Sequence, residues 1–171
     1  MAELAAYGQP LQPATPYREV SMVSTNIGRS RVLCIDGDPT TANWMAATLQ
    51  RAHVDCLIER ESRGRDGFRH LMAEGIDICV VEYALPDMTG VQLCGLLRQV
   101  GCNVPVIFFS AMNRDIDKQM AFGSGADEYL CKPDDLDIFA DAVQHLLKRR
   151  RPLYFARSQE SSQERNLEKA A

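Results

Sequence analysis

The sequence has no long apolar run, so it predicts no membrane-spanning helix. No segment approaches the roughly 20 consecutive apolar residues that such a helix requires. The first residues, MAELAAYGQPLQPATP, also lack the basic start and the apolar core of a secretory signal. We therefore expect a cytoplasmic protein that has no membrane partner.

The chain also has no excess of basic charge and no metal-binding cysteine pattern. Its 171 residues include 19 Lys and Arg against 23 Asp and Glu, a net charge of −4. This balance argues against a general polyanion binder, and we expect no nucleic acid among the partners. The six cysteines form neither a C-x-x-C pair nor a His-paired metal spacing. We expect free thiols that pack as small hydrophobic side chains in a reducing compartment.

Composition divides the chain into three regions. Residues 1–29 mix Pro, Gly, Ser and Thr without an apolar period, which predicts a flexible N-terminal leader. Residues 151–171 form a polar C-terminal tail that is too short to fold alone. Residues 30–150 have the length of one ordinary domain. The expectation is a single domain with no attached output domain.

Strand and helix patterns alternate through the central region. Five short apolar segments predict strands: RVLCID, VDCLIE, IDICVVE, VPVIFFS and EYLCK. Several are apolar almost throughout, as expected for strands whose sheet is covered on both faces. Helical patterns separate the strands, which predicts an α/β fold built on a doubly wound parallel sheet.

The helical patterns have recognisable starts and apolar faces. Asp38 is the expected N-cap of the first helix and Pro39 its first residue. Asp135 is expected to open the last helix and Pro152 to close it. Spacings of three and four predict the core-facing residues. They are Ala42, Met45, Ala46 and Leu49; Phe68, Leu71 and Met72; Leu93, Leu96, Leu97 and Val100; Ile116 and Met120; and Leu136, Phe139, Val143, Leu146 and Leu147.

Polar side chains stand at the carboxyl ends of four predicted strands. In doubly wound sheets, ligands bind beyond these ends, near the point where strand order reverses. The sequence therefore predicts that four side chains converge in one crevice: Asp36, Glu82, Ser110 and Lys132.

Four motifs, VLCIDGDP, LPDMTG, PVIFFSA and GADEYLCKP, resemble the receiver domain of bacterial two-component response regulators. The resemblance covers roughly residues 31–149. It implies a flavodoxin-like fold with five parallel strands in the order 2-1-3-4-5. It also implies phosphorelay signalling, in which a histidine kinase supplies a phosphoryl group to an aspartate after the third strand.

Five positions match the roles known in that family. Asp36 matches the first acid of an acidic pair, and the carbonyl of Ala84 matches a metal ligand. Ser110 and Lys132 match the residues that contact the phosphoryl group, and Tyr129 matches the aromatic switch residue.

Two positions depart from the family pattern. Gly37 stands where the resemblance expects a second, metal-binding acid, and Glu82 stands where it expects the phosphoaccepting aspartate. In the family pattern, three carboxylates and one lysine give the empty site a charge of about −2. Asp36, Glu82 and Lys132 together carry only about −1, so the site attracts a divalent cation less strongly. A Mg²⁺ site at Asp36, Glu82 and Ala84 is therefore expected to be weak or absent. Asp38, a second acid of the pocket, either bends into it or caps the first helix.

These departures indicate an atypical receiver that is not an enzyme and has no catalytic residue. Glu82 is a constitutive mimic of the phosphorylated state or a relic that pairs with Lys132; phosphorylation of Glu82 itself is a third interpretation. The protein is expected to act by contact with a histidine kinase or another signalling protein. The expected contact face is formed by the fourth helix, the fifth strand and the fifth helix.

Two alternatives stay open at the level of sequence. One is a conventional Mg²⁺-dependent receiver that accepts the phosphoryl group on Asp36 or Asp38. The other is a phosphatase, because IDGDPT resembles the first motif of haloacid dehalogenase-like enzymes. Asp36 would then be the nucleophile and Asp38 the general acid, with Ser110 and Lys132 as phosphate contacts.

Overall fold

A five-stranded parallel sheet forms the centre of the computed structural model, which describes residues 29–73 and 75–149. The sheet order is β2-β1-β3-β4-β5, which confirms the predicted fold. The strands are β1 (Ser30–Ile35), β2 (Cys56–Glu61), β3 (Ile78–Val81), β4 (Val106–Ser110) and β5 (Glu128–Cys131). The predicted C-terminal tail, and all of the predicted leader except Arg29, lie outside the described residues.

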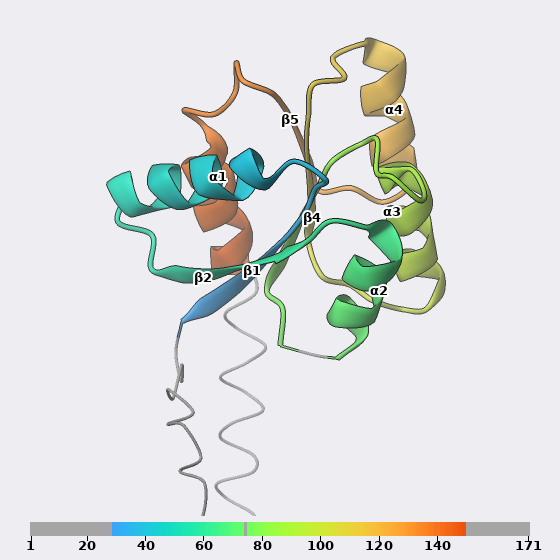
Figure 1. The fold of residues 1–171 in the computed structure, drawn as a ribbon, viewed down its shortest axis with the longest axis horizontal. Helices are drawn as coiled ribbons and strands as arrows, with labels where there is room; N and C mark the ends of the chain where they lie inside the picture. The colour runs from blue at the N-terminus through green and yellow to red at the C-terminus, as the bar shows by residue number, and fades with distance from the viewer. Residues whose placement is uncertain (1–28, 74, 150–171) are drawn as a thin grey trace, which may run out of the picture.

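Helices cover both faces of the sheet (Figure 1). On one face lie α1 (Pro39–Arg51) and a further helix over residues 139–149. On the other face lie α2 (Gly64–Met72), α3 (Gly90–Gln99) and α4 (Asp115–Gly123). Within 29–73 and 75–149, no helix is long and apolar enough to cross a membrane.

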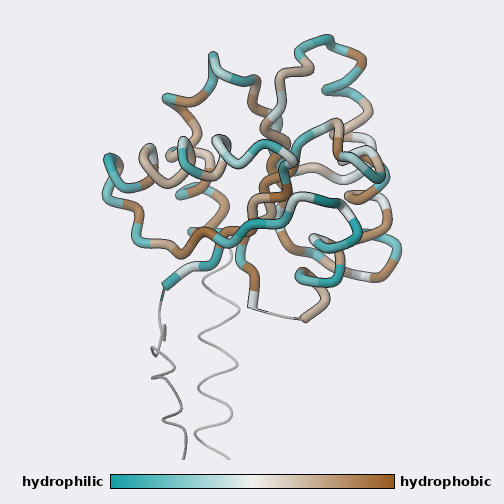
Figure 2. The backbone as a smooth tube through the Cα atoms, in the orientation of Figure 1, coloured by the Kyte–Doolittle hydropathy of each residue, from teal (hydrophilic) through white to brown (hydrophobic). Residues whose placement is uncertain are grey.

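Two apolar clusters, one on each side of the sheet, form the core. Alternate residues of a strand point to opposite faces, and β1 follows this rule. Its Val32 and Cys34 pack toward α1, whereas Leu33 and Ile35 pack toward α2 and α3. Within the described residues, hydrophobic residues concentrate in the strands at the centre of the fold, and hydrophilic residues lie mainly on the helices and loops (Figure 2).

The helix α4 turns its large apolar side chains toward the solvent, contrary to the prediction. Ile116 and Met120 were expected to face the core, but they are 54% and 49% exposed. The buried residues of α4 are Asp117 and Ala121. Arg114 compensates the buried Asp117 carboxylate with two hydrogen bonds of 2.8 Å. The large apolar side chains of α4, Ile116, Met120 and Phe122, therefore lie on the surface.

The start of the last helix also differs from the prediction. This helix begins at residue 139, after a series of turns over 132–138, so Asp135 does not open it. The backbone N–H of Asp135 donates to the carbonyl of Cys131, and its carboxylate accepts from the Cys131 N–H at 2.8 Å. These two bonds fold Asp135 back on the end of β5. Phe139, Val143 and Leu146 are buried, as predicted.

The cysteines are free thiols, as predicted, and Cys34, Cys79, Cys94 and Cys131 are buried. Burial raises the pKa of Cys34 to about 12, so its thiol stays protonated at neutral pH. These side chains therefore act as small apolar residues of the core.

Candidate functional site

Three strand ends meet in a buried cluster of charges. The Lys132 ammonium, after β5, lies 2.5 Å from Oδ2 of Asp36, after β1, and 2.8 Å from Oε2 of Glu82, after β3. These side chains are only 11%, 5% and 15% exposed, in the same order. The structure therefore brings together the charged residues that the sequence placed in one crevice.

Glu82 bonds to more than the lysine. Its Oε1 accepts a short hydrogen bond from the Ser110 hydroxyl at the end of β4. The same oxygen accepts the backbone N–H of Tyr83 at 2.7 Å. Both carboxylate oxygens of Glu82 are thus occupied, one by Lys132 and the other by Ser110 and the backbone.

Lys132 has a third oxygen partner, which is not among the predicted site residues. The hydroxyl of Thr41, in the first turn of α1, accepts from the ammonium at 3.0 Å. The ammonium also lies 5.4 Å from the centre of the Phe109 ring, within the range of a cation–π contact. Burial opposes the charged form, but the bonds and charges of Asp36 and Glu82 outweigh it and raise the pKa of Lys132. The lysine is therefore a fixed cation at the centre of the site.

A chain of hydrogen bonds leads from Glu82 to the predicted switch residue. The Ser110 oxygen accepts the backbone N–H of Met112 at 3.1 Å. The carbonyl of Met112 accepts the hydroxyl of Tyr129 at 2.6 Å. Tyr129 is 7% exposed, and its ring stacks on Phe108 with centroids 5.7 Å apart. Glu82, Ser110, Met112 and Tyr129 thus form one connected path, which we call the relay.

Asp38 belongs to the start of α1. Its carboxylate accepts the backbone N–H of Thr40 at 2.8 Å, which confirms the predicted N-cap. Hydrogen bonds from Thr40 lower the pKa of Asp38. Its own N–H donates to Oδ1 of Asp36 at 2.8 Å. Asp38 thus orients Asp36 through the backbone, and its exposed carboxylate serves the helix instead of the pocket.

The oxygen atoms at this site do not fit a magnesium ion as ligands. Mg²⁺ takes oxygen ligands in near-octahedral geometry. All four carboxylate oxygens of Asp36 and Glu82 already accept hydrogen bonds, and Gly37 has no side chain. Ala84 lies in the loop after β3, where it pairs with Thr89. Over residues 29–73 and 75–149, no three His, Cys, Asp or Glu side chains are arranged to hold a metal ion.

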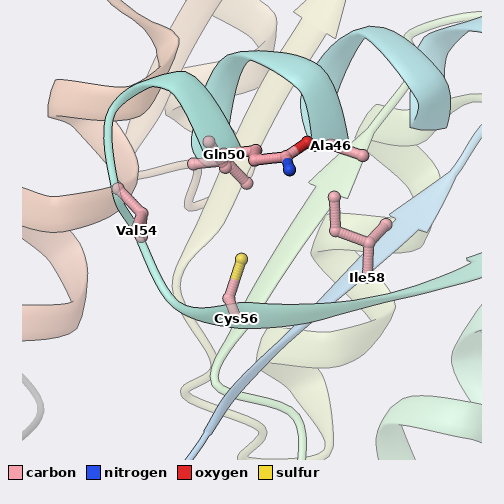
Figure 3. A pocket seen from close by; sticks show the side chains of 6 residues that line it. Ala46, Gln50, Val54, Cys56 and Ile58 are labelled. Atoms are coloured by element: carbon pink, nitrogen blue, oxygen red, sulfur yellow. The ribbon is translucent and has the colours of Figure 1, made fainter.

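A shallow groove of about 150 Å³ lies between α1 and β2, away from the charged cluster. Its lining is mostly apolar, and the Cys56 side chain points toward α1 across it (Figure 3). The groove is at the beginning of β2, whereas Asp36, Glu82 and Lys132 stand at the opposite ends of their strands. It is therefore not part of the site described above.

A family model and curated relatives of this chain point to the same protein family. The family model described as the response regulator receiver domain matches residues 32–144. The heme response regulator HssR of Staphylococcus aureus (strain MRSA252) is 32% identical over 117 residues, which are 68% of this chain and 51% of HssR. This chain therefore spans about half the length of the curated relatives it matches.

Solved structures show the same fold. The receiver domain of the Francisella response regulator 1452 has a TM-score of 0.64 and 27% identity, over 71% of this chain and 98% of that one. The receiver domain of a Luxo repressor protein from Vibrio parahaemolyticus has a TM-score of 0.68 over 75% of this chain and 97% of its own. Its identity is 22%, so this likeness concerns the fold alone.

Proposed function

The chain belongs to the response regulator receiver domain family of two-component signalling, and from this premise we propose that Glu82 mimics a phosphorylated aspartate. One observation carries the proposal. The Glu82 carboxylate bonds to both side chains that the family resemblance assigns to the phosphoryl group, Ser110 and Lys132. The output of this receiver would then not depend on phosphorylation.

The length of its side chain explains how Glu82 reaches both Ser110 and Lys132. Glutamate has one methylene more than aspartate, so its carboxylate projects further into the crevice, toward the position of a phosphoryl group. There it offers oxygen acceptors and a negative charge to a hydroxyl and an ammonium. An ionised acceptor strengthens both hydrogen bonds. The carboxylate thus supplies in permanent form what a phosphoryl group supplies in transient form.

The relay favours the mimic over a relic that merely neutralises Lys132. Charge neutralisation alone requires only the Lys132 contact, whereas Glu82 also binds the hydroxyl of Ser110. Ser110 continues through Met112 to the hydroxyl of Tyr129. Tyr129 is buried at the position that the resemblance identifies as the switch. This arrangement supports an engaged state that needs no phosphate.

The same arrangement supports weak or absent Mg²⁺ binding. A divalent cation at Asp36 or Glu82 would have to displace the Lys132 ammonium or one of the N–H and O–H donors. The site carries about −1 with Lys132 in place, so the electrostatic gain from the exchange is small. We expect Mg²⁺ to be unnecessary for the engaged state.

The proposed partner is a histidine kinase or another signalling protein that contacts α4, β5 and the helix over 139–149. The exposed apolar residues of α4 support this surface, since Ile116 and Met120 are each about half exposed. Exposed apolar side chains that lie together mark protein contact sites. We propose a role by contact, without catalysis, for this receiver.

The test is a phosphodonor experiment on four proteins. The wild type, Gly37→Asp, Glu82→Asp and the double variant are incubated with acetyl phosphate and Mg²⁺, and intact masses are measured. The double variant alone should gain a phosphoryl group, because each single variant still lacks the metal ligand or the aspartate acceptor. The new side chain has room, since the nearest atom to a Cβ at Gly37 is Cγ of Pro86 at 3.7 Å.

The open alternatives predict a different result. If Asp36 or Asp38 accepts a phosphoryl group, the wild type gains a mass that hydroxylamine removes and that Asp36→Asn or Asp38→Asn abolishes. If the chain is a phosphatase, it releases phosphate from a generic phosphomonoester in the presence of Mg²⁺. Either outcome contradicts the proposal, as does a double variant that stays inert.

A further inference from the structure

We propose that Thr41 is a positioning residue of this site, which fixes the Lys132 ammonium and thereby couples the first turn of α1 to the relay. The inference rests on the proposed function, because it concerns what keeps Glu82 engaged. It assigns a role to a residue outside the set that the sequence and the family resemblance identified.

The hydrogen-bond count of the ammonium carries the inference. An ammonium group has three N–H donors. Lys132 directs them to three oxygens: Oδ2 of Asp36 at 2.5 Å, Oε2 of Glu82 at 2.8 Å and Oγ1 of Thr41 at 3.0 Å. Thr41 is 1% exposed, so its hydroxyl is fixed inside the protein. The threonine is thus the one neutral member of a complete set of acceptors.

Removal of the Thr41 hydroxyl would leave an ammonium proton without a partner in a nearly buried position. A buried, unsatisfied donor costs free energy, more so when it is charged. The ammonium would then shift toward water, and its contact with Glu82 would loosen. Glu82 would keep its hydrogen bonds from the Ser110 hydroxyl and the Tyr83 N–H, but its Oε2 would no longer be held in place by Lys132. The disturbance would therefore pass along the relay.

The first turn of α1 touches the site at two points. Thr41 binds Lys132, and the backbone N–H of Asp38 binds Oδ1 of Asp36. Pro39 begins the helix between them, and Asp38 caps it. The start of α1 and the charged cluster therefore form one hydrogen-bonded unit. A displacement of this turn would move Thr41 away from Lys132 and would break the hydrogen bond from the Asp38 N–H to Asp36.

Three variants separate a positioning role from a general packing role. Thr41→Val removes the hydroxyl but keeps the branched shape, and Thr41→Ser keeps the hydroxyl. Thr48→Val is the matched control, because Thr48 is 5% exposed on the same helix. Its hydroxyl accepts from Arg51 at 3.2 Å instead of from the site. If Thr41→Val does not fold, Thr41→Ala takes its place.

The readout is the NMR signal of the Lys132 ammonium, identified by its absence in Lys132→Met, without phosphodonor or partner. Thr41→Val should speed the exchange of these protons with water roughly tenfold, the factor that corresponds to one hydrogen bond of about 1.4 kcal/mol. It should also shift the Met112 amide. Thr41→Ser should restore both values, and Thr48→Val should leave them at the wild-type level.

Two results would overturn the inference: an unchanged ammonium exchange rate in Thr41→Val, or an equal acceleration in Thr48→Val. Glu82→Ala is measured in parallel to separate the two proposals. If Thr41→Val is silent but Glu82→Ala still shifts Met112 and Tyr129, only the role of Thr41 falls. If Glu82→Ala is silent as well, the proposed function falls with it.

Discussion

The Lys132 ammonium lies 2.8 Å from Oε2 of Glu82, although the two residues are 50 positions apart in the chain. Parallel strands bring them together because their carboxyl ends meet at the same edge of the sheet. Both side chains are largely buried, so water screens their attraction little. The pair therefore holds the start of the relay in place.

Removal of the lysine charge should destabilise the domain strongly. Lys132→Met leaves the buried carboxylates of Asp36 and Glu82 without their shared cation, and the expected loss is about 3 kcal/mol. Lys148→Met changes an exposed lysine and should cost less than about 0.5 kcal/mol. Urea unfolding of both variants measures the difference. Equal stability of the two variants would show that Asp36 and Glu82 do not need the ammonium.

The alkaline titration of Tyr129 should report its burial. Burial raises the pKa of Tyr129 from 10.0 to about 12, because the pocket disfavours the phenolate. A raised folded-state pKa contributes stability that is fully present below pH 10.0 and is lost as the pH rises through about 12. The ultraviolet absorbance of tyrosinate, taken as wild type minus Tyr129→Phe, measures this pKa. A difference that titrates near pH 10.0 would mean that Tyr129 is exposed to solvent.

Gly90, the first residue of α3, should tolerate no side chain. A Cβ at this position would lie 2.6 Å from the carbonyl oxygen of Glu82 and 2.8 Å from the Phe108 ring. We expect Gly90→Ala to lower the free energy of unfolding by about 2 kcal/mol, since the backbone after Glu82 must move.

Gly95 in the same helix is the matched control for Gly90. A Cβ at Gly95 has no neighbour within 4 Å, and alanine favours helix, so Gly95→Ala should stabilise by about 0.5 kcal/mol. Chemical denaturation of both variants gives the two values. Similar effects of the two substitutions would contradict the close packing at Gly90.

The sequence predicted the parts of the site that depend on strand ends and on side-chain chemistry. Asp36, Glu82, Ser110 and Lys132 follow apolar strands, and a parallel sheet brings such residues to one edge. Tyr129 followed from the family resemblance. The N-cap of Asp38 followed from the adjacent Pro39, since an acidic cap before a helical proline is a local pattern.

Other parts depend on contacts that leave little trace in a sequence. Met112 joins Ser110 to Tyr129 through its backbone N–H and carbonyl, which every residue except proline possesses. Thr41 gave a faint indication, since it lies one turn before the buried Met45 and on the same face of α1. Its contact with Lys132 spans 91 positions and depends on the complete fold.

The errors of sequence interpretation also have physical causes. They include Ala46, Met72, Leu96 and Val100, which were predicted to face the core but are exposed. Spacing identified α4 as amphipathic but could not show that Ile116 and Met120 face solvent, because Arg114 allows Asp117 to occupy the inner side. Asp135 has the sequence features of a helix N-cap, but its carboxylate accepts a hydrogen bond from the backbone N–H of Cys131, at the end of β5.

The central claim is that Glu82 keeps Tyr129 engaged because its carboxylate reaches Ser110 and Lys132 without phosphate. Glu82→Asp tests this reach most directly, since it keeps the charge and removes one methylene. The measurement is the NMR signals of the Tyr129 ring and the Met112 amide, in the wild type and in Glu82→Asp, without phosphodonor. We predict that the shorter side chain releases Ser110, so that the Met112 amide shifts and the Tyr129 ring becomes mobile. Identical spectra for the two proteins would contradict the claim.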